Sequence, residues 1–210
     1  MNSEAQRLIE SAGVMGITLD GAQAAALLRL LDELSHWNRR YNLTAITARA
    51  SMVSAHLLDS LAAAPDLHGT RIADIGTGAG FPGLPLALIE PQRQFTLIDS
   101  VAKKIRFVTH AARELGLANV TPLQARVETL SPDTPFDTVI ARAFAALPDL
   151  LGMVRGLCGT GTRVIALKGR YPQDELAAVP RDWRLTQARD LKVPGLDAER
   201  HSLTFRLQQA

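Results

Sequence analysis

The residues of this chain with the clearest chemical meaning form the run Asp74-Ile75-Gly76-Thr77-Gly78-Ala79-Gly80. The short apolar segment at residues 71–75 predicts a β-strand directly before the glycines, and Pro82 suits the first turn of a following helix. Glycine allows a tight turn and a close approach of the backbone to a ligand. Because ligands of open α/β sheets bind beyond the carboxyl ends of the strands, we expect a cofactor at this turn.

Two cofactors compete for the turn. Residues 78–83 read Gly-Ala-Gly-Phe-Pro-Gly, which satisfies the dinucleotide pattern G-x-G-x-x-G. That pattern should begin at the strand end, whereas here Gly76 and Thr77 intervene. The carboxylate of Asp74 would also repel a pyrophosphate, but a cationic ligand without phosphates, such as S-adenosylmethionine, tolerates it. The spacing Asp-x-Gly-x-Gly-x-Gly therefore favours S-adenosylmethionine over NAD.

Two later segments could complete such a site. Asp99 ends a second predicted strand, where its carboxylate can accept hydrogen bonds from both ribose hydroxyls. A cap for the following helix is its alternative role. The segment Ala125-Arg126-Val127-Glu128 follows a third predicted strand, at the place where such folds enclose an adenine, although a solvated turn explains its spacing equally well.

The pattern of the chain changes near residue 67. Before it the sequence reads as helical: Asp20 and Gln23 have the spacing of a capping box, and apolar residues at helical spacing continue as far as Tyr41. A further helix is expected from about Ser51 to Ala64, stopped by Pro65. We therefore predict an N-terminal helical extension, residues 1–67, packed on a Rossmann-like core, residues 68–210.

The core alternates short β-rich runs with helical stretches, which implies a mostly parallel sheet with helices on both faces. The last two predicted strands are joined by a loop containing Pro194-Gly195 and no helix, which indicates an antiparallel pair at the edge. The predicted fold class is therefore α/β, a Rossmann-like methyltransferase fold with a seven-stranded sheet. Its strands are expected at residues 71–74, 94–99, 120–124, 138–141, 163–167, 183–188 and 202–207, and its helices at 84–89, 102–115, 146–157 and 173–178.

Composition narrows the class of protein. A chain of 210 residues with 47% hydrophobic and 21% charged residues is ordinary for a soluble globular protein. No apolar run approaches the roughly 20 residues that span a bilayer, and residues 1–10 do not resemble a signal peptide. Its one cysteine, Cys158, excludes an internal disulfide and a cysteine-based metal cluster. We predict a cytoplasmic monomer that binds no membrane and no metal.

The charge of the chain is uneven. Residues 1–69 carry five Lys and Arg against seven Asp and Glu, whereas residues 70–210 carry eighteen against fourteen. The positive excess thus lies in the part with the glycine-rich turn, which suits a polyanionic partner, although a merely solvated basic surface has the same composition.

The order and spacing of several motifs carry a family resemblance that extends from about Trp37 to Leu207. The chain resembles the bacterial ribosomal RNA small subunit methyltransferase G family, also called glucose-inhibited division protein B. Besides the glycine-rich turn and its continuation Phe81-Pro82-Gly83, the motifs are Trp37-Asn38, Tyr41-Asn42-Leu43-Thr44, His56-x-x-Asp59-Ser60, Leu97-Ile98-Asp99-Ser100, Lys103-Lys104-Ile105-Arg106-Phe107, Arg126-Val127-Glu128, Arg142-Ala143-Phe144-Ala145, Leu167-Lys168-Gly169 and Glu199-Arg200-His201.

The resemblance implies transfer of a methyl group from S-adenosylmethionine, leaving S-adenosylhomocysteine, to N7 of a guanine in 16S ribosomal RNA. The family's target is guanine 527, in the decoding region of the small subunit. Carried over by motif, the cofactor contacts are Gly76, Phe81, Val127, Glu128 and Arg142. Many relatives have Leu at the position of Phe81, so this contact is expected to be apolar.

This chemistry needs no general base, because N7 of guanine has a free lone pair at neutral pH. Catalysis would be mainly alignment of the reacting atoms. Arg142 follows a predicted strand at the carboxyl edge of the sheet, and we expect it to contact cofactor or target base; a salt bridge to a nearby carboxylate is the alternative. His56 and Asp59, three residues apart, are expected to form a buried hydrogen-bonded pair that docks the helical extension near the cleft.

Basic residues near several strand ends could ring one cleft and contact RNA phosphates, which would make binding dependent on salt. Solvated surface charge is the alternative for each of them. A methyltransferase acting on a small molecule or a protein, and a cofactor-dependent RNA-binding protein without turnover, also remain open. The predicted RNA contacts are Lys103, Lys104, Arg106, Arg126, Lys168, Arg170, Arg200 and His201.

Overall fold

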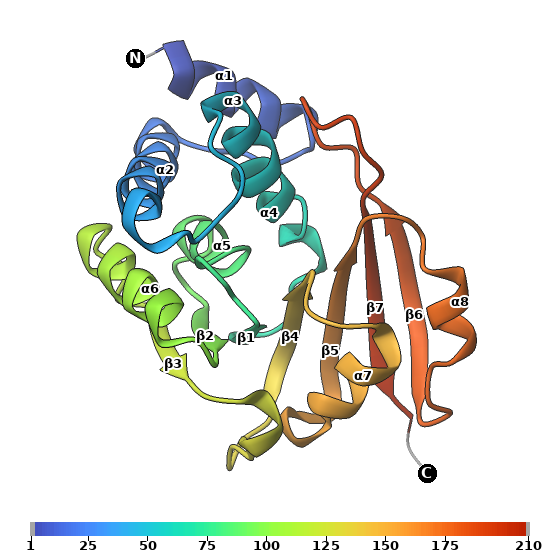
Figure 1. The fold of residues 1–210 in the computed structure, drawn as a ribbon. Coiled ribbons are helices and arrows are strands. Elements are labelled where there is room, and N and C mark those ends of the chain that lie inside the picture. The colour runs from blue at the N-terminus through green and yellow to red at the C-terminus, as the bar shows by residue number, and fades with distance from the viewer. Residues whose placement is uncertain (1–2, 209–210) are drawn as a thin grey trace.

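A seven-stranded sheet forms the centre of the molecule in the computed structural model, which describes residues 3–208 (Figure 1). The strand order is β3-β2-β1-β4-β5-β7-β6; β7 runs antiparallel to both β5 and β6, and all other neighbouring pairs are parallel. The predicted sheet, mostly parallel with an antiparallel pair at one edge, is confirmed. The strands are β1 (Arg71–Ile75), β2 (Gln94–Asp99), β3 (Val120–Gln124), β4 (Phe136–Arg142), β5 (Cys158–Lys168), β6 (Trp183–Asp190) and β7 (His201–Leu207).

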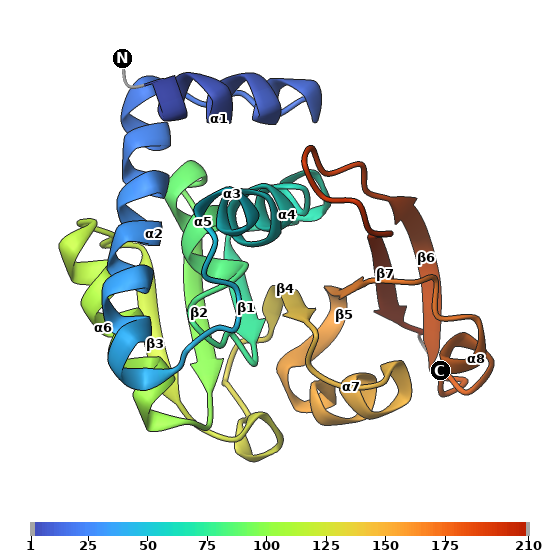
Figure 2. The same ribbon diagram turned by 45° about the horizontal axis from the view of Figure 1, so that its top comes forward.

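Helices cover both faces of the sheet, with α7 on the opposite side from α1, α3 and α4 (Figure 2). Alternate strand residues therefore enter two separate apolar clusters: Ile72 of β1 lies in the cluster with the helical extension, whereas Ala73 packs with α7. The helices are α1 (Ser3–Val14), α2 (Gly21–Tyr41), α3 (Arg49–Met52), α4 (Asp59–Leu61), α5 (Gly83–Ile89), α6 (Ala102–Glu114), α7 (Leu147–Met153) and α8 (Gln173–Ala177).

The long helix α2 shows how the extension is attached. Its predicted capping box is present: the Asp20 carboxylate accepts from the Gln23 N–H at 2.7 Å, and the Gln23 side chain accepts from the Asp20 N–H at 3.0 Å. Leu27, Leu31 and Leu34 are fully buried in the cluster that also contains the sheet residues. The extension therefore shares its core with the sheet, and the division of the chain at residue 67 stays a prediction.

The second helical segment of the extension differs from the expected single helix at residues 51–64. A helical run covers Arg49–Leu61, but Val53–Leu58 (η1) is π-helical, and Pro65 lies inside a separate 3-10 turn, Ala64–Asp66 (η2). Single π-helical turns within α-helices frequently occur at functional sites. Here the π-helical segment carries His56 and leads directly into Asp59.

Asp66, just after α4, joins the extension to the edge strands. Asp66 is 3% exposed, and its carboxylate accepts hydrogen bonds from Arg189 of β6 at 2.8 and 3.1 Å and from Ser202 of β7 at 2.6 Å. A buried carboxylate is tolerated only when it is paired in this way. Arg189 also donates to the Ala62 carbonyl at 2.8 Å, so these contacts hold residues 62–66 against Arg189 of β6 and Ser202 of β7.

The strand order fixes where a ligand can bind. From β1 the chain moves outward to β2 and β3, then returns to form β4 on the other side of β1. The connections therefore diverge above β1 and β4 and leave a crevice at their carboxyl ends. The glycine-rich turn after β1 and Arg142 at the end of β4 both lie there.

Candidate active site

The glycine-rich turn is built around a buried carboxylate. Gly76, Gly78 and Gly80 have φ angles of +65°, +61° and +84°, a region that favours glycine. Asp74 is fully buried, and its Oδ2 accepts from the Thr77 hydroxyl at 2.6 Å and from the Gly83 N–H at 2.8 Å. Asp74 thus ties the start of α5 to the end of β1 and lies beneath the turn, outside the adjoining cavity.

Burial raises the pKa of Asp74 to about 6, although the hydrogen bonds from Thr77 and Gly83 act in the opposite direction. A Cβ at Gly83 would lie 2.6 Å from the Asp74 Oδ2 and 2.7 Å from the Leu97 Cγ. The glycine at residue 83, part of the competing dinucleotide pattern, is therefore required by the close packing of α5 on the strands.

A cavity of about 360 Å³ opens beyond the carboxyl ends of β1 and β2. The predicted residues Gly76, Asp99, Val127 and Glu128 all line it, and Gly78 adjoins it through a hydrogen bond from its N–H to the Asp99 Oδ2 at 3.1 Å. We call it the first cavity. Its lining residues are Ile75, Gly76, Ile98, Asp99, Ser100, Val101, Lys104, Ala125, Arg126, Val127, Glu128, Ala143, Phe144 and Met153.

Asp99 combines both roles weighed for it. Its Oδ1 accepts from the Val101 N–H at 2.9 Å, at the start of α6, as a helix cap does. Its Oδ2 accepts from the Lys104 ammonium at 3.1 Å in addition to Gly78. Since a carboxylate has about four acceptor sites, Asp99 retains capacity for a ribose hydroxyl.

A second cavity of about 370 Å³ adjoins the first, and Ala143 lines both. Three cationic side chains and one carboxylate line it, whereas two of each line the first cavity. The backbone of Ala143 has a φ of +49°, unusual for a residue with a side chain. The residues lining the second cavity are Ile46, Ala55, His56, Asp59, Arg142, Ala143, Leu167, Lys168, Gly169 and Arg200.

Asp59 organises the second cavity. Its Oδ2 accepts from Arg142 Nη1 at 2.8 Å and its Oδ1 accepts from Arg200 Nε at 3.1 Å. Arg142 Nη1 also donates to the Ala55 carbonyl at 2.8 Å. The salt bridge considered for Arg142 is therefore present, and it holds the guanidinium at the cavity wall rather than removing it from the site.

His56 and Asp59 are both buried, as expected, but the prediction that they form a hydrogen bond with each other is wrong. His56 Nε2 instead meets the Thr44 hydroxyl at 3.1 Å, and its buried Nδ1 has no hydrogen-bond partner within residues 3–208. A π-helical turn holds more residues than an α-helical one, so residues three apart are no longer aligned. Burial, then the positive charge of Arg142, lowers the pKa of His56 to about 4, so the ring is neutral at pH 7.

Phe81 is buried between two residues of the second cavity. Its ring stacks on His56 with centroids 4.8 Å apart, and the Arg142 guanidinium lies 5.8 Å from its centroid. Phe81 and Gly80 line neither cavity. Phe81 therefore supports the wall of the second cavity, and its expected contact with the cofactor remains a prediction.

The structure does not bring the eight predicted RNA contacts into one cleft. Lys104 and Arg126 line the first cavity, and Lys168 and Arg200 line the second. Lys104 and Lys168 are also paired internally, with Asp99 and Glu175. Lys103, Arg106, Arg170 and His201 line neither cavity.

Ala143 and Phe144, which the sequence indicated only as part of a family motif and not as site residues, line the first cavity directly after Arg142. Their place at the carboxyl end of β4 was the available signal. Sequence reasoning also assigned no role to Thr77, whose hydroxyl holds Asp74. Trp37 is partly buried and packs against Tyr41, Phe107 and the core.

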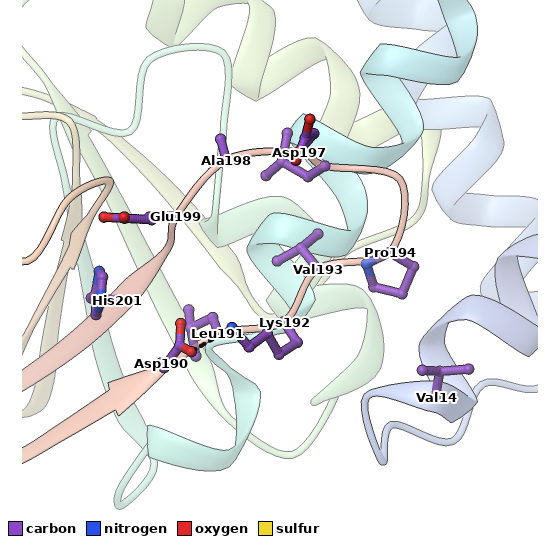
Figure 3. A pocket seen from close by; sticks show the side chains of 11 residues that line it. Val14, Asp190, Leu191, Lys192, Val193, Pro194, Asp197, Ala198, Glu199 and His201 are labelled. Carbon is purple, nitrogen blue, oxygen red and sulfur yellow. Dashed lines mark ion pairs between the residues drawn. The ribbon is translucent and has the colours of Figure 1, made fainter.

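A larger cavity, of about 830 Å³, lies elsewhere, along the loop between β6 and β7 (Figure 3). Asp190, Asp197 and Glu199 line it, and the Lys192 ammonium is paired with Asp190 at 2.7 Å. This lining is net negative and would repel a polyanion. The two cavities at Ala143 are therefore the better candidate for the active site.

Within residues 3–208, no group of three or more His, Cys, Asp or Glu side chains is placed to hold a metal ion. The same part of the chain contains no helix both long and apolar enough to cross a membrane.

Comparison with known proteins identifies the family. The family described as GidB, rRNA small subunit methyltransferase G, matches residues 23–204. The chain belongs to the ribosomal RNA small subunit methyltransferase G family. The ribosomal RNA small subunit methyltransferase G of Aeromonas salmonicida (strain A449) is 46% identical to it over 91% of this chain and 92% of the relative. That of Pseudomonas syringae pv. tomato is also 46% identical, over 96% of both chains.

Solved structures of low identity share the methyltransferase fold. A SAM-dependent methyltransferase from Aquifex aeolicus has a TM-score of 0.58 at 16% identity and covers 75% of this chain and 93% of its own. TrmN from Thermus thermophilus has a TM-score of 0.57 at 23% identity and covers 81% of this chain and 53% of its own. These comparisons confirm three predictions: that the chain belongs to the methyltransferase G family, that it has a Rossmann-like methyltransferase fold, and that its cofactor is S-adenosylmethionine. They do not support the NAD alternative.

Proposed function

We propose that this methyltransferase transfers a methyl group from S-adenosylmethionine to N7 of a guanine in 16S ribosomal RNA, the family target being guanine 527. One observation carries the proposal. The first cavity, at the glycine-rich turn, and the second, lined by Arg142, Lys168 and Arg200, meet at a single residue, Ala143. Two ligands seated in these cavities would have their reacting groups side by side.

The first cavity has the groups that the cofactor needs. Asp99 would accept a hydrogen bond from a ribose hydroxyl, and Val127 and Glu128 would enclose the adenine. The methionine part would lie against the backbone of the glycine-rich turn at Gly76. Asp74 acts as a positioning residue, because it is buried beneath the turn and fixes its shape. The bound cofactor supplies an electrophilic methyl group and a positive charge on sulfur.

The second cavity has donors suited to a guanine. O6 of guanine is a hydrogen-bond acceptor, and the guanidinium of Arg142 or the Lys168 ammonium can donate to it. The N7 lone pair then forms the new bond to the methyl carbon while the carbon–sulfur bond breaks and its electrons stay on sulfur. No proton has to leave first, so the step requires no general base.

The positive charge moves from sulfur to the base during this step. Asp59 partly neutralises the two arginines of the cavity, so the base can become cationic among them at a lower electrostatic cost. We further propose that Arg142 is the residue that orients the base, that the protein acts as a monomer in the cytoplasm, and that residues 1–67 form an extension to the catalytic part.

The test supplies radiolabelled S-adenosylmethionine to small ribosomal subunits from cells lacking this protein, with naked 16S RNA and partly assembled subunits as parallel substrates. The product RNA is cleaved chemically at 7-methylguanine. The wild-type protein should label RNA and give one cleavage site, whereas Asp99→Ala should bind cofactor weakly and label little. Absence of 7-methylguanine on every substrate form would exclude the proposed reaction.

A further inference from the structure

Three arginines lie side by side on one face of the edge strands. Arg184 of β6 and Arg206 of β7 are direct partners across the antiparallel pair. Val164 of β5 pairs with Phe205, so Arg163 and Arg206 occupy adjoining positions one residue further along the same register. Since neighbouring strands lie about 4.8 Å apart, the three side chains form a row across β5, β7 and β6. We call Arg163, Arg206 and Arg184 the arginine row.

The arginine row lies on the face of the sheet turned away from α7. Phe205 and Trp183, which alternate with the row residues along β7 and β6, are buried in the cluster of α7. Arg184 is exposed, and Arg163 and Arg206 are half-buried. This part of the sheet face is therefore accessible to a partner, in contrast to the part held by Asp66.

Nothing within residues 3–208 neutralises the row. Its members form no ion pair there, and the hydrogen bond from Arg163 reaches a backbone carbonyl, that of Asp66, at 3.4 Å. The Asp66 carboxylate is itself occupied by Arg189 and Ser202. Like charges placed directly opposite in a sheet are destabilising. The direct pairing of Arg184 with Arg206 therefore has an electrostatic cost that no ion pair or side-chain hydrogen bond of these two residues within residues 3–208 offsets.

We propose that the arginine row binds the phosphate backbone of the ribosomal RNA substrate, at a point separate from the methylated nucleotide. Arg163 precedes Lys168, at the wall of the second cavity, by five residues of one strand, or about 16 Å. RNA seated in that cavity would have to extend over about this distance to reach the row. The inference rests on the proposed function, because that function supplies the polyanion.

Arginine suits this role better than lysine does, because its planar guanidinium can bind a phosphate through two parallel hydrogen bonds. Phosphate contacts orient a nucleic acid without reading its sequence. The row would accordingly strengthen binding of the subunit and leave the choice of guanine to the second cavity.

The test compares the double variant Arg184→Gln, Arg206→Gln with the wild type. Binding of small subunits is measured over a series of salt concentrations, together with KM, kcat and Tm. Loss of two phosphate contacts should reduce the slope of log K against log salt by about two and raise KM about tenfold at physiological salt, with kcat unchanged. Tm should stay level or rise, because two like charges no longer face each other.

Two control variants sharpen the result. Arg29→Gln, Arg113→Gln removes the same charge from the exposed sides of α2 and α6 and should leave slope and KM near the wild-type values. Arg184→Lys, Arg206→Lys keeps the charge and should keep most of the slope. If the salt slope of the glutamine variant equalled that of the Arg29, Arg113 control, the proposal would be overturned. This holds even if methylation fell, because a fall in methylation without a change of slope would indicate that the row contacts a protein and not RNA.

Failure of the proposed function would be distinguishable. If the wild type formed no 7-methylguanine but the glutamine variant still lost salt-dependent binding to 16S RNA, the row would stand as an RNA-binding surface and the reaction would not. If methylation proceeded and the salt slope did not change, the reaction would stand and the row would not.

Discussion

Replacement of Asp59 by Ala is the sharpest test of how the second cavity is held together. The Asp59 side chain is 6% exposed and is the shared partner of two guanidinium groups, Arg142 from the end of β4 and Arg200 from the loop before β7. Without it, two positive charges would face each other with no carboxylate between them. The loss should therefore appear both in stability and in the placement of Arg142.

The size of the effect follows from burial. Removal of one partner of a buried ion pair costs about 3–5 kcal/mol. The Arg142 and Arg200 side chains retain 19% and 27% exposure, so water relieves part of that cost. We expect Asp59→Ala to lower the free energy of unfolding by about 2–3 kcal/mol. For a chain of this size that is a fall in Tm of about 4–12 °C.

The assay is a double-mutant cycle on the cofactor-free protein, with Asp59→Ala, Arg200→Ala and the double variant unfolded by heat and by denaturant. We expect a coupling energy of about 1–2 kcal/mol between Asp59 and Arg200. Asp59→Asn, which keeps an acceptor and loses the charge, should lie between the wild type and Asp59→Ala. A Tm within 2 °C of the wild type, with no coupling, would refute the assigned role of Asp59.

Three further predictions concern the cavities and the turn. Arg142→Ala should lower kcat for methyl transfer about 100-fold in a folded protein, because the base loses its orienting group; it should also raise the pKa of His56 from about 4, measurable by NMR, since Arg142 lowers that pKa. Unchanged turnover would remove Arg142 from the site. Gly76→Ala should weaken S-adenosylmethionine binding in calorimetry and destabilise the protein by about 1–2 kcal/mol, because φ is +65° and a Cβ would collide with the Phe144 ring. Asp74 has a pKa of about 6 in the folded protein, against an ordinary value of 3.8. Between these two pH values the folded state therefore binds more protons than the unfolded state. The free energy of unfolding should fall by about 3 kcal/mol as the pH rises through this range. Asp74→Asn should abolish that fall, and a wild-type Tm that rises over this pH range more than that of Asp74→Asn would contradict the assignment.

The fold was predictable because its signals are local. Buried parallel strands read as short apolar runs, and the predicted strand at residues 94–99 coincides with β2. The capping box of Asp20 and Gln23 likewise involves neighbours in sequence. The insertion of β7 between β5 and β6 was not predictable, because strand pairing depends on contacts between distant segments.

The same distinction between local signals and contacts of distant segments applies to the candidate site. The turn at Gly76 and the carboxylate of Asp99 belong to two successive strand ends, so their spacing in the sequence located them. Asp59 lies 83 positions before Arg142 and 141 positions before Arg200 in the sequence. No local pattern in the sequence therefore predicts its contacts with them. The π-helical segment before Asp59 further removed the alignment that an α-helix would give His56 and Asp59.

The position of β7 between β5 and β6 has a consequence for synthesis of the chain. Until His201–Leu207 has left the ribosome, β5 ends the growing sheet with unpaired backbone groups beside apolar residues such as Val164 and Ile165, and β6 has no partner. Exposed edges of this kind pair readily with other chains. A nascent chain or a product truncated near residue 200 would therefore lose the pairing of two strands at once, and would be a target for chaperones and proteases rather than a slightly weakened enzyme.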